Sequence, residues 1–417
     1  MNMKAVPITP DELDELSLRH PQGGMQQCSQ MQVLAAHRTE FSDIVGVKND
    51  NGDIVAAALI EYTRGHFGIE GSIWFGPLCD FHDMAMLKIM TDGIRSAAAS
   101  RGAISVTCWP NVEYLRHESD GAPNGEKDDA TINNLTSLGW HHAGFGTGYG
   151  SVCNRWNYVK DLNGIADEKV LLHSYDKRTQ WSVKRAQSMG VHVRELDQSE
   201  FPIFANIERN TAERRGFVAR DEQYFHDFKD AFGAQARFML AEIHIAEYVS
   251  QMTAKRDALT EKVRTLQAKY DEHPTTKTER QLGEETRNLE AANKRLDEAT
   301  EFAKNGDVLP AAASLFVERP REMVYLFSGS LEKYKPFYAS ALIQHWAMSR
   351  CLEAGIPRYN FYGISGVFND PDDEGRGVLE FKQGFNGYVE ELVGEFTLPV
   401  NKLRFGIKEA ASKLLHK

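Results

Sequence analysis

Several features that would identify the compartment or the cofactor of a protein are scarce in these 417 residues. There are only five cysteines, and none forms a C-x-x-C pair, which argues against a disulfide framework and against a zinc site. No stretch approaches the roughly twenty apolar residues of a membrane span, and residues 1–16 lack the apolar core of a signal peptide. We therefore expect reduced thiols and a cytoplasmic location, with peripheral contact at the inner face of the membrane left open.

Positive charge is also scarce, since the net charge is −11. Binding of nucleic acid through bulk charge is therefore not expected, although a local basic groove is left open. The histidines show no metal-binding spacing: His141 and His142 are adjacent, and His66, His82 and His192 stand alone. No G-x-S-x-G elbow is present, which argues against a serine hydrolase of the α/β type.

The strongest positive signal is an internal duplication. Residues 51–60 read Asn-Gly-Asp followed by a short apolar run, and residues 305–316 repeat that order. Asn-Gly-Asp is a turn signal, so each copy is expected to close a hairpin and enter a strand. The apolar run at 44–47 directly precedes the first turn, whereas residues 246–304 separate the run at 238–245 from the second. The sequence thus predicts a duplicated α/β domain with an arm inserted in one hairpin turn.

The rest of the pattern divides the chain into domains. Residues 44–80 read as a meander of strands, helical spacing over 83–101 leads to a strand at 104–109, and a strand pair is expected over 140–159. The second half repeats this theme. The expected parts are domain 1 at residues 1–160, domain 2 at residues 161–246 and 305–417, and the arm at residues 247–304.

Residues within the arm recur in alternating steps of four and three, as in a coiled coil. The two sets are Met252, Arg256, Leu259, Val263, Leu266 and Tyr270, then Leu282, Thr286, Leu289, Asn293, Leu296 and Thr300. His273-Pro274 lies between the sets, and proline breaks a helix. The pattern predicts an antiparallel helical hairpin with a thin apolar seam. Its balanced charges favour a solvated structural arm over a docking rod for RNA.

Two other segments have a structural and a functional interpretation. Gly144–Gly150 has the composition of a phosphate loop, but the flank after it suits a strand, so we expect glycine-permitted strand packing or bulges. The basic helix expected over residues 175–189 carries Lys184 and Arg185 beside Lys177. It forms either a solvated face or an electropositive wall for RNA or a phosphorylated substrate.

Two single cations, Arg220 and Lys382, also have both a structural and a functional interpretation. Arg220 precedes Asp221, a good helix N-cap, so a phosphate there would meet a guanidinium and a helix dipole. The alternative is a surface salt bridge. Lys382 stands among aromatic residues, where a lysine either snorkels to the surface or faces a developing oxyanion. The residues alone do not decide between these roles.

Longer motifs connect these residues to a known family. They are Val324–Ser330, Arg358–Val367, Phe381–Asn386 and Val389–Phe396 in the C-terminal third, with Trp74–Pro77, Leu138–His141 and Arg155-Trp156 before them. On these motifs the chain resembles the Fem aminoacyltransferases (FemA, FemB, FemX and the MurM-type enzymes) over nearly its whole length. The resemblance implies an α/β fold of two tandem GNAT-like (acetyltransferase-like) domains with an antiparallel coiled-coil arm in the second.

The resemblance also implies an activity. An amino acid would pass from aminoacyl-tRNA to the stem-peptide amine of a peptidoglycan precursor, either lipid-linked (lipid II) or UDP-MurNAc-pentapeptide, and so build the interpeptide bridge. No cofactor is expected, because aminoacyl-tRNA is a co-substrate. Such chemistry needs alignment, loss of a proton from the amine and stabilisation of the tetrahedral oxyanion. A homodimer is left open.

Roles follow by resemblance for individual residues. Lys382 resembles the family lysine assigned to the oxyanion, with Phe381 beside it. Arg220 resembles the arginine that binds the acceptor phosphates, and Tyr224 and Tyr334 match aromatic pocket residues. Lys184 and Arg185 are further substrate-binding candidates.

The family's first-domain lysine has no clear counterpart here. The region around residues 30–38 offers His37 and Arg38 instead, which leaves that half of the acceptor site unassigned. Two other functions compete with aminoacyl transfer. An acyl-CoA N-acyltransferase would need an Arg/Gln-x-x-Gly-x-Gly/Ala loop, and the segment at 375–377 lacks that spacing. A non-catalytic scaffold using the arm would make Lys382 dispensable.

Overall fold

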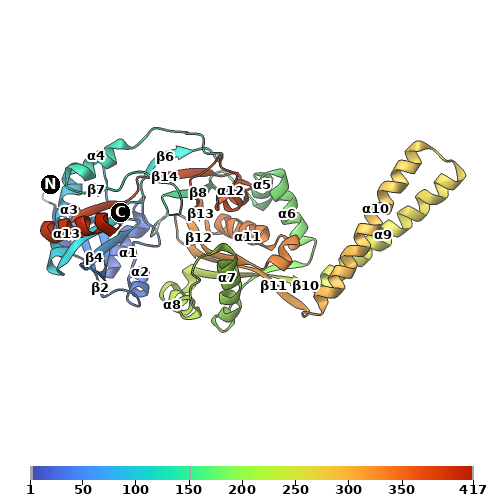
Figure 1. Cartoon of the computed structure of the whole chain (residues 1–417), viewed down its shortest axis with the longest axis horizontal. Coiled ribbons are helices and arrows are strands. Elements are labelled where there is room, and N and C mark those ends of the chain that lie inside the picture. The colour runs from blue at the N-terminus through green and yellow to red at the C-terminus, as the bar shows by residue number, and fades with distance from the viewer. Residues whose placement is uncertain (1–2, 150–151, 416–417) are drawn as a thin grey trace.

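The computed structural model describes residues 3–149 and 152–415. A seven-stranded sheet and an eight-stranded sheet lie side by side along the long axis of the molecule, and a helical hairpin projects beyond the second sheet (Figure 1). All five cysteines are unpaired and buried. None of the helices in the described part of the chain combines the length and apolar character that a membrane crossing needs.

The first sheet has the strand order β1-β2-β3-β4-β5-β15-β7. Its strands are β1 (Lys4–Pro7), β2 (Phe41–Lys48), β3 (Ile54–Gly65), β4 (Gly68–Trp74), β5 (Ala103–Trp109), β15 (Phe396–Pro399) and β7 (His141–His142). Only β4 and β5 run parallel, and a parallel pair needs a crossover. That crossover is α3 (Met84–Ser100), which buries Leu87, Met90 and Ile94 at the predicted helical spacing.

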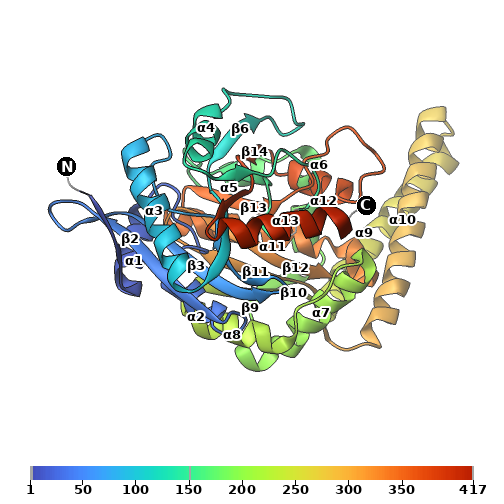
Figure 2. The same ribbon diagram turned by 60° about the vertical axis from the view of Figure 1, so that its left-hand side comes forward.

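Helices cover both faces of this sheet (Figure 2). α3 packs on the face that carries Val47 and Ile60, whereas α1 (Pro10–Arg19) and α2 (Ser29–Ala35) pack on the face of Ile44 and Leu59. Alternating residues of a strand point to opposite faces, so a strand buried on both sides is apolar throughout. This explains the continuous apolar run of β3.

The second sheet has the order β6-β14-β8-β13-β12-β11-β10-β9. Its strands are β6 (Glu113–His117), β14 (Tyr388–Leu392), β8 (Trp156–Asp161), β13 (Arg358–Gly363), β12 (Met323–Ser330), β11 (Val308–Glu318), β10 (Ala236–His244) and β9 (Val191–Glu195). Here β12 and β13 form the parallel pair, joined by α11 (Ala339–Ala354). The run β10-β11-β12-α11-β13 therefore repeats β2-β3-β4-α3-β5. The predicted fold class of two tandem GNAT-like domains is confirmed.

The predicted boundary at residue 160 does not separate the two sheets. β6 and most of β8 precede it but lie in the second sheet, while β15 and α13 (Lys402–Leu415) return to the first. In β15, Thr397 pairs with Thr107 on one side and His141 on the other. The strand pair expected over 140–159 is also wrong, because β7 and β8 belong to different sheets. Pairing partners of short strands are set by distant segments, which local pattern does not encode.

A shared apolar core crosses the junction of the two domains. Leu16 of α1 and Leu34 of α2 belong to the same buried cluster as Phe204, Phe225 and Leu240 of the second domain. The remaining helices are α4 (Asp129–Ser137), α5 (Glu168–His173), α6 (Lys177–Gln187), α7 (Phe201–Arg215), α8 (Glu222–Phe232) and α12 (Arg376–Gln383). The junction is therefore a packed interface that positions residues of both domains around one site.

The arm consists of α9 (Ile245–Glu272) and α10 (Thr276–Ala303), inserted between β10 and β11 as predicted. Leu259, Val263 and Leu266 lie half-buried along the predicted seam of α9. The seam of α10 differs, because Asn293 and Thr300 are exposed and the adjacent small residues are buried instead. Those buried residues are Ala292 and Ala299. The root packs into the second-domain core through Tyr248, Met252, Ala299 and Phe302. Only the outer arm is a solvated rod.

Candidate functional site

Arg220 and Tyr224 stand at the start of α8. This helix begins where predicted, since the Asp221 carboxylate accepts a 2.8 Å hydrogen bond from the amide of Tyr224. The guanidinium carbon of Arg220 lies 5.0 Å from the centre of the Tyr224 ring. Within residues 3–149 and 152–415, no carboxylate lies at salt-bridge distance from Arg220, so the surface salt bridge is replaced by a cation–π contact.

Arg38 brings a second guanidinium to this place from the first domain. Its Nη2 atom donates to both carboxylate oxygens of Glu61, at 3.2 and 3.1 Å, and its guanidinium carbon lies 4.6 Å from the Trp74 ring centre. Glu61 is buried, and burial raises the pKa of its carboxyl group against the opposing charge of Arg38. Sequence reasoning left Arg38 outside the site, because nothing local showed which helix of the second domain it would face.

The charges of both cations act on Tyr224. Burial raises the pKa of Tyr224, while the charges of Arg220 and then Arg38 oppose that rise. The α2–β2 connection also approaches α8 directly, with His37 Nδ1 3.6 Å from Asp227 Oδ2. The junction therefore brings the segment that carries Arg38 beside the helix that begins at Arg220 and Tyr224.

Tyr362 continues this arrangement toward the second domain. Its ring centre lies 6.1 Å from that of Phe75, and its phenol oxygen is 3.5 Å from Gln26 Nε2. Both contacts come from the first domain. Its φ is +64°, a left-handed conformation that is costly for a bulky residue and that clusters at functional sites. The β8–β13 pairing shifts register between Asn360 and Gly363, which accommodates the turn of the backbone.

Lys382 lies directly behind this bend. It is only 4% exposed, and its Nζ atom donates to the carbonyl oxygens of Gly363 at 2.6 Å and Tyr362 at 3.3 Å. No carboxylate within the described ranges pairs with it, and burial lowers the pKa of Lys382 to about 7. A surface-snorkelling lysine is therefore excluded. An ammonium has three donors, so one N–H remains for a substrate.

Phe381 and the start of α6 adjoin the end of α12, which carries Lys382. Phe381 is half-buried, with its ring centre 5.4 Å from that of Phe385. The amide of Asp176 donates a 2.9 Å hydrogen bond to the carbonyl of Gly384, directly before α6. The basic helix thus begins against Gly384, two residues after Lys382.

The glycine-rich segment forms a loop, so the expected strand packing is wrong within Gly144–Tyr149, and Gly150 lies outside the described residues. The carbonyl of Gly146 accepts hydrogen bonds of 3.0 Å from both Arg155 Nη1 and Trp156 Nε1. The loop lines a cavity of about 180 Å³. Asn154 also lines this cavity and packs against Gly363. Asn154 therefore separates the cavity from Gly363, whose carbonyl Lys382 contacts.

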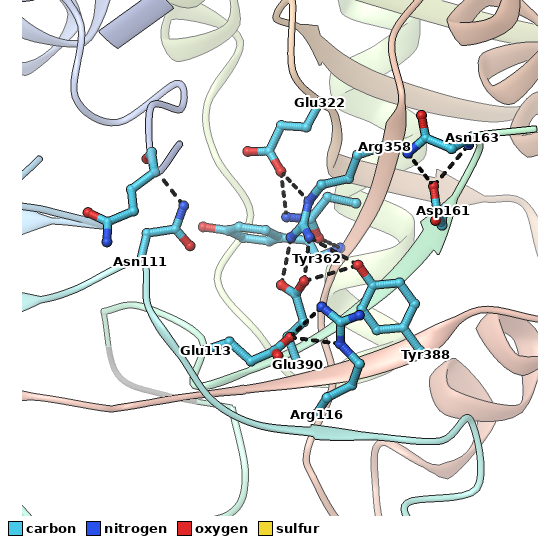
Figure 3. Close-up of polar contacts among 12 residues, drawn as sticks. Asn111, Glu113, Arg116, Asp161, Asn163, Glu322, Arg358, Tyr362, Tyr388 and Glu390 are labelled. Carbon is cyan, nitrogen blue, oxygen red and sulfur yellow. Dashed lines mark hydrogen bonds and ion pairs between the residues drawn. The ribbon is translucent and has the colours of Figure 1, made fainter. Parts of the chain in front are cut away.

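A second cavity, of about 230 Å³, opens at the domain junction over an ion-pair network (Figure 3). Arg358 donates to Glu390 through Nη1 and through Nη2, the latter at 2.6 Å, and to Glu322 through Nε at 3.2 Å. Burial, and then Glu390, raise the pKa of Glu113 beside it. The network ties the residue before β12 to β13 and β14, and so supports the strand that carries Tyr362.

The other predicted site residues lie elsewhere. Tyr334 is buried at the root of the arm, edge-on to Phe302 and Phe337, and is not brought to Tyr224. Lys184 is exposed on α6, and Arg185 is half-buried facing the arm. The site therefore divides into a junction part and an α6–arm part.

Comparisons with known proteins identify the family of the chain. The FemAB family model matches residues 8–413. Aminoacyltransferase FemB of Staphylococcus epidermidis is 30% identical over 379 residues, covering 90% of this chain and 89% of the relative. Aminoacyltransferase FemA of Staphylococcus epidermidis is 28% identical over 421 residues, covering 99% and 100%. The crystal structure of FemX superposes with a TM-score of 0.77 at 21% identity, covering 97% of this chain and 99% of that one. The chain belongs to the FemAB family.

Proposed function

We propose that this protein transfers an amino acid from aminoacyl-tRNA to the stem-peptide amine of a peptidoglycan precursor, and so builds the interpeptide bridge. The observation that carries the proposal is that the shared core packs the α2 segment of the first domain, which leads to Arg38, beside α8, at whose start Arg220 contacts Tyr224. The FemA and FemB relatives are named aminoacyltransferases, which supports the same reaction class.

The two guanidiniums are assigned to the phosphates of the acceptor. Arg38 contacts Glu61 through Nη2, which leaves Nε and Nη1 as donors, and Arg220 lies at a helix N-terminus that also favours an anion. Guanidinium groups grip phosphate with paired, directed hydrogen bonds. A phosphorylated precursor held here would direct its peptide along the junction, past Tyr362.

Lys382 is assigned to the reacting carbonyl. The acceptor amine attacks the ester carbonyl of aminoacyl-tRNA, forming the amide bond, and the ester bond to the ribose oxygen then breaks. The proton lost by the amine passes to the departing ribose oxygen, so no protein base is required. Two N–H groups of Lys382 are held by Gly363 and Tyr362, and the third would stabilise the tetrahedral oxyanion. Phe381 limits the space around it.

The donor RNA is assigned to the α6–arm surface. Burial and the nearby charge of Arg295 lower the pKa of Arg185, and burial, Arg185 and Arg295 lower that of Lys255. Across the described residues, no carboxylate lies within salt-bridge distance of these three cations. Trp181 of α6 is 52% exposed beside them, and an exposed aromatic ring can stack a base. Since the residue before α6 is bonded to Gly384, two residues after Lys382, RNA bound here would lead toward the reacting centre.

A reconstitution assay tests this proposal. Purified protein is mixed with UDP-MurNAc-pentapeptide or a lipid-linked precursor and a panel of charged tRNAs, and products are read by mass spectrometry. We expect a mass increment of one or more amino acid residues that disappears with ribonuclease. An increment supported by acyl-CoA instead, or no transfer with any charged tRNA and precursor, would overturn it.

A further inference from the structure

The root of the arm brings together three side chains that lie far apart in the sequence or on different elements. His192 lies in β9, His244 ends β10, and Glu247 lies in the first turn of α9. Their ligand atoms all lie within 4.8 Å of one another, and the two imidazole rings are 4.4 Å apart between centres. The sequence interpretation of His192 as an isolated histidine therefore does not hold in three dimensions.

We infer that His192, His244 and Glu247 form a binding site for a divalent transition-metal ion of the Zn²⁺ type. Two imidazoles and one carboxylate are the donor set that such ions favour. His192 Nε2 lies 2.8 Å from Glu247 Oε2, and His244 Nδ1 lies 3.7 Å from Glu247 Oε1. Bonds of about 2.1 Å in a tetrahedral site place donor atoms roughly 3.4 Å apart, so small side-chain rotations would suffice.

A second carboxylate supports this assignment independently. While Nδ1 of His244 faces Glu247, its other nitrogen, Nε2, lies 3.1 Å from Oε1 of Glu242. Metal-binding histidines commonly donate their second N–H to such a carboxylate, which sets the tautomer and the ring orientation. Glu242 is itself buried and held by a 2.9 Å hydrogen bond from Arg194 Nε. The outer shell that a metal-binding imidazole needs is thus already built.

The backbone beneath the site is also closely packed. The amide of His244 donates a 2.8 Å hydrogen bond to the carbonyl of Gly190. Gly190 has a φ of +68°, and a Cβ atom there would lie only 2.9 Å from the carbonyl oxygen of His244. The ion would therefore link β9 to the first turn of α9 and restrict movement of the arm relative to the domain. With three protein ligands, at least one coordination position stays open to water.

Metal binding by the full-length protein tests the inference without reference to transfer activity. Chelator-treated protein is titrated with Zn²⁺ against a chromophoric chelator, and Co²⁺ is added separately to follow its visible absorption. His192→Ala, His244→Ala and Glu247→Gln are compared with His82→Ala, a control that removes an exposed histidine paired with one carboxylate, Asp128. Circular dichroism confirms that each variant is folded.

We expect one ion per chain in wild type and in His82→Ala, with at least tenfold weaker binding in each of the three site variants. Glu242→Gln should weaken binding by about 10–100-fold, because it removes the outer carboxylate and keeps all three ligands. Hydrogen exchange around residues 190–195 and 244–250 should slow when Zn²⁺ is added. Absence of binding in wild type, or equal binding in the folded site variants, would mean that the group is only a hydrogen-bonded cluster.

Discussion

The Nζ atom of Lys382 donates a 2.6 Å hydrogen bond to the carbonyl oxygen of Gly363, at the end of the strand where Tyr362 takes a positive φ. When Lys382 is protonated, this contact anchors a buried ammonium against main-chain carbonyls and leaves one donor free. Lys382→Met removes the donor and nearly keeps the side-chain length, so packing should change little. We expect the transfer rate to fall by about 10²–10³-fold in a folded protein, measured by single-turnover assay. A folded variant within a few-fold of wild type would contradict the oxyanion role.

The same residue predicts a pH dependence of stability. Burial lowers the pKa of Lys382 from 10.5 to about 7, so between these values the unfolded chain holds a proton that the folded protein has lost. Stability contributed by this group therefore rises with pH over that window, by at most about 1.4 kcal/mol per unit. Urea unfolding at pH 7 and pH 9.5 should show wild type gaining stability relative to Lys382→Met. Lys269→Met, on the exposed outer arm, should show the same pH dependence of stability as wild type. Equal pH dependence in wild type, Lys269→Met and Lys382→Met would refute the lowered pKa of Lys382.

Arg38→Lys and Arg220→Lys should each raise the KM for the acceptor precursor, by roughly tenfold or more. Lysine keeps the charge but loses the forked donors that grip phosphate. The KM for charged tRNA should stay close to that of wild type. Arg64→Lys, an exposed arginine 3.8 Å from Glu40, serves as the control. If both KM values move together in either variant, the phosphates of the acceptor lie elsewhere.

Arg185→Ala combined with Arg295→Ala should raise the KM for charged tRNA and leave that for the acceptor unchanged. The matched control is Arg264→Ala with Arg280→Ala, which removes two exposed cations farther out on the arm. Binding of uncharged tRNA, measured in a salt series, should lose part of its salt dependence only in the first pair.

Shortening the arm separates its root from its outer part. Deleting residues 257–294 and joining the helices with a short glycine-serine linker keeps Lys255, Arg295 and the packed residue Phe302. The fold should persist, and the KM for tRNA should rise less than in the Arg185–Arg295 double variant. A larger rise would place the RNA contacts on the outer arm.

Arg358→Met should destabilise the protein by about 3–5 kcal/mol, because it leaves Glu390 and Glu322 buried without their partner. Arg264→Met, which breaks an exposed pair with Glu261, should cost less than about 1 kcal/mol. Denaturant unfolding of the three proteins measures the difference. Similar midpoints for both variants would show that the junction network is solvated in practice.

The sequence by itself determined the repeated strand–helix pattern, the inserted arm and the family motifs. These signals are local: the Asn-Gly-Asp turns, the apolar spacing of α3 and the proline that separates the arm helices act on neighbouring residues. Asp221 capped α8 as predicted for the same reason. Steric and hydrogen-bonding preferences of this kind depend only on neighbouring residues, so a short segment of sequence is enough to predict them.

Tertiary structure alone decided which distant side chains meet. Thr397 pairs with Thr107, and the segment that carries Arg38 lies beside α8 because a shared core packs α2 against that helix. Burial then turned Lys382 from a candidate surface cation into one whose pKa lies near 7. His192 and His244 likewise became neighbours through the pairing of β9 with β10. Such contacts depend on long-range packing and desolvation, which no short stretch of sequence encodes.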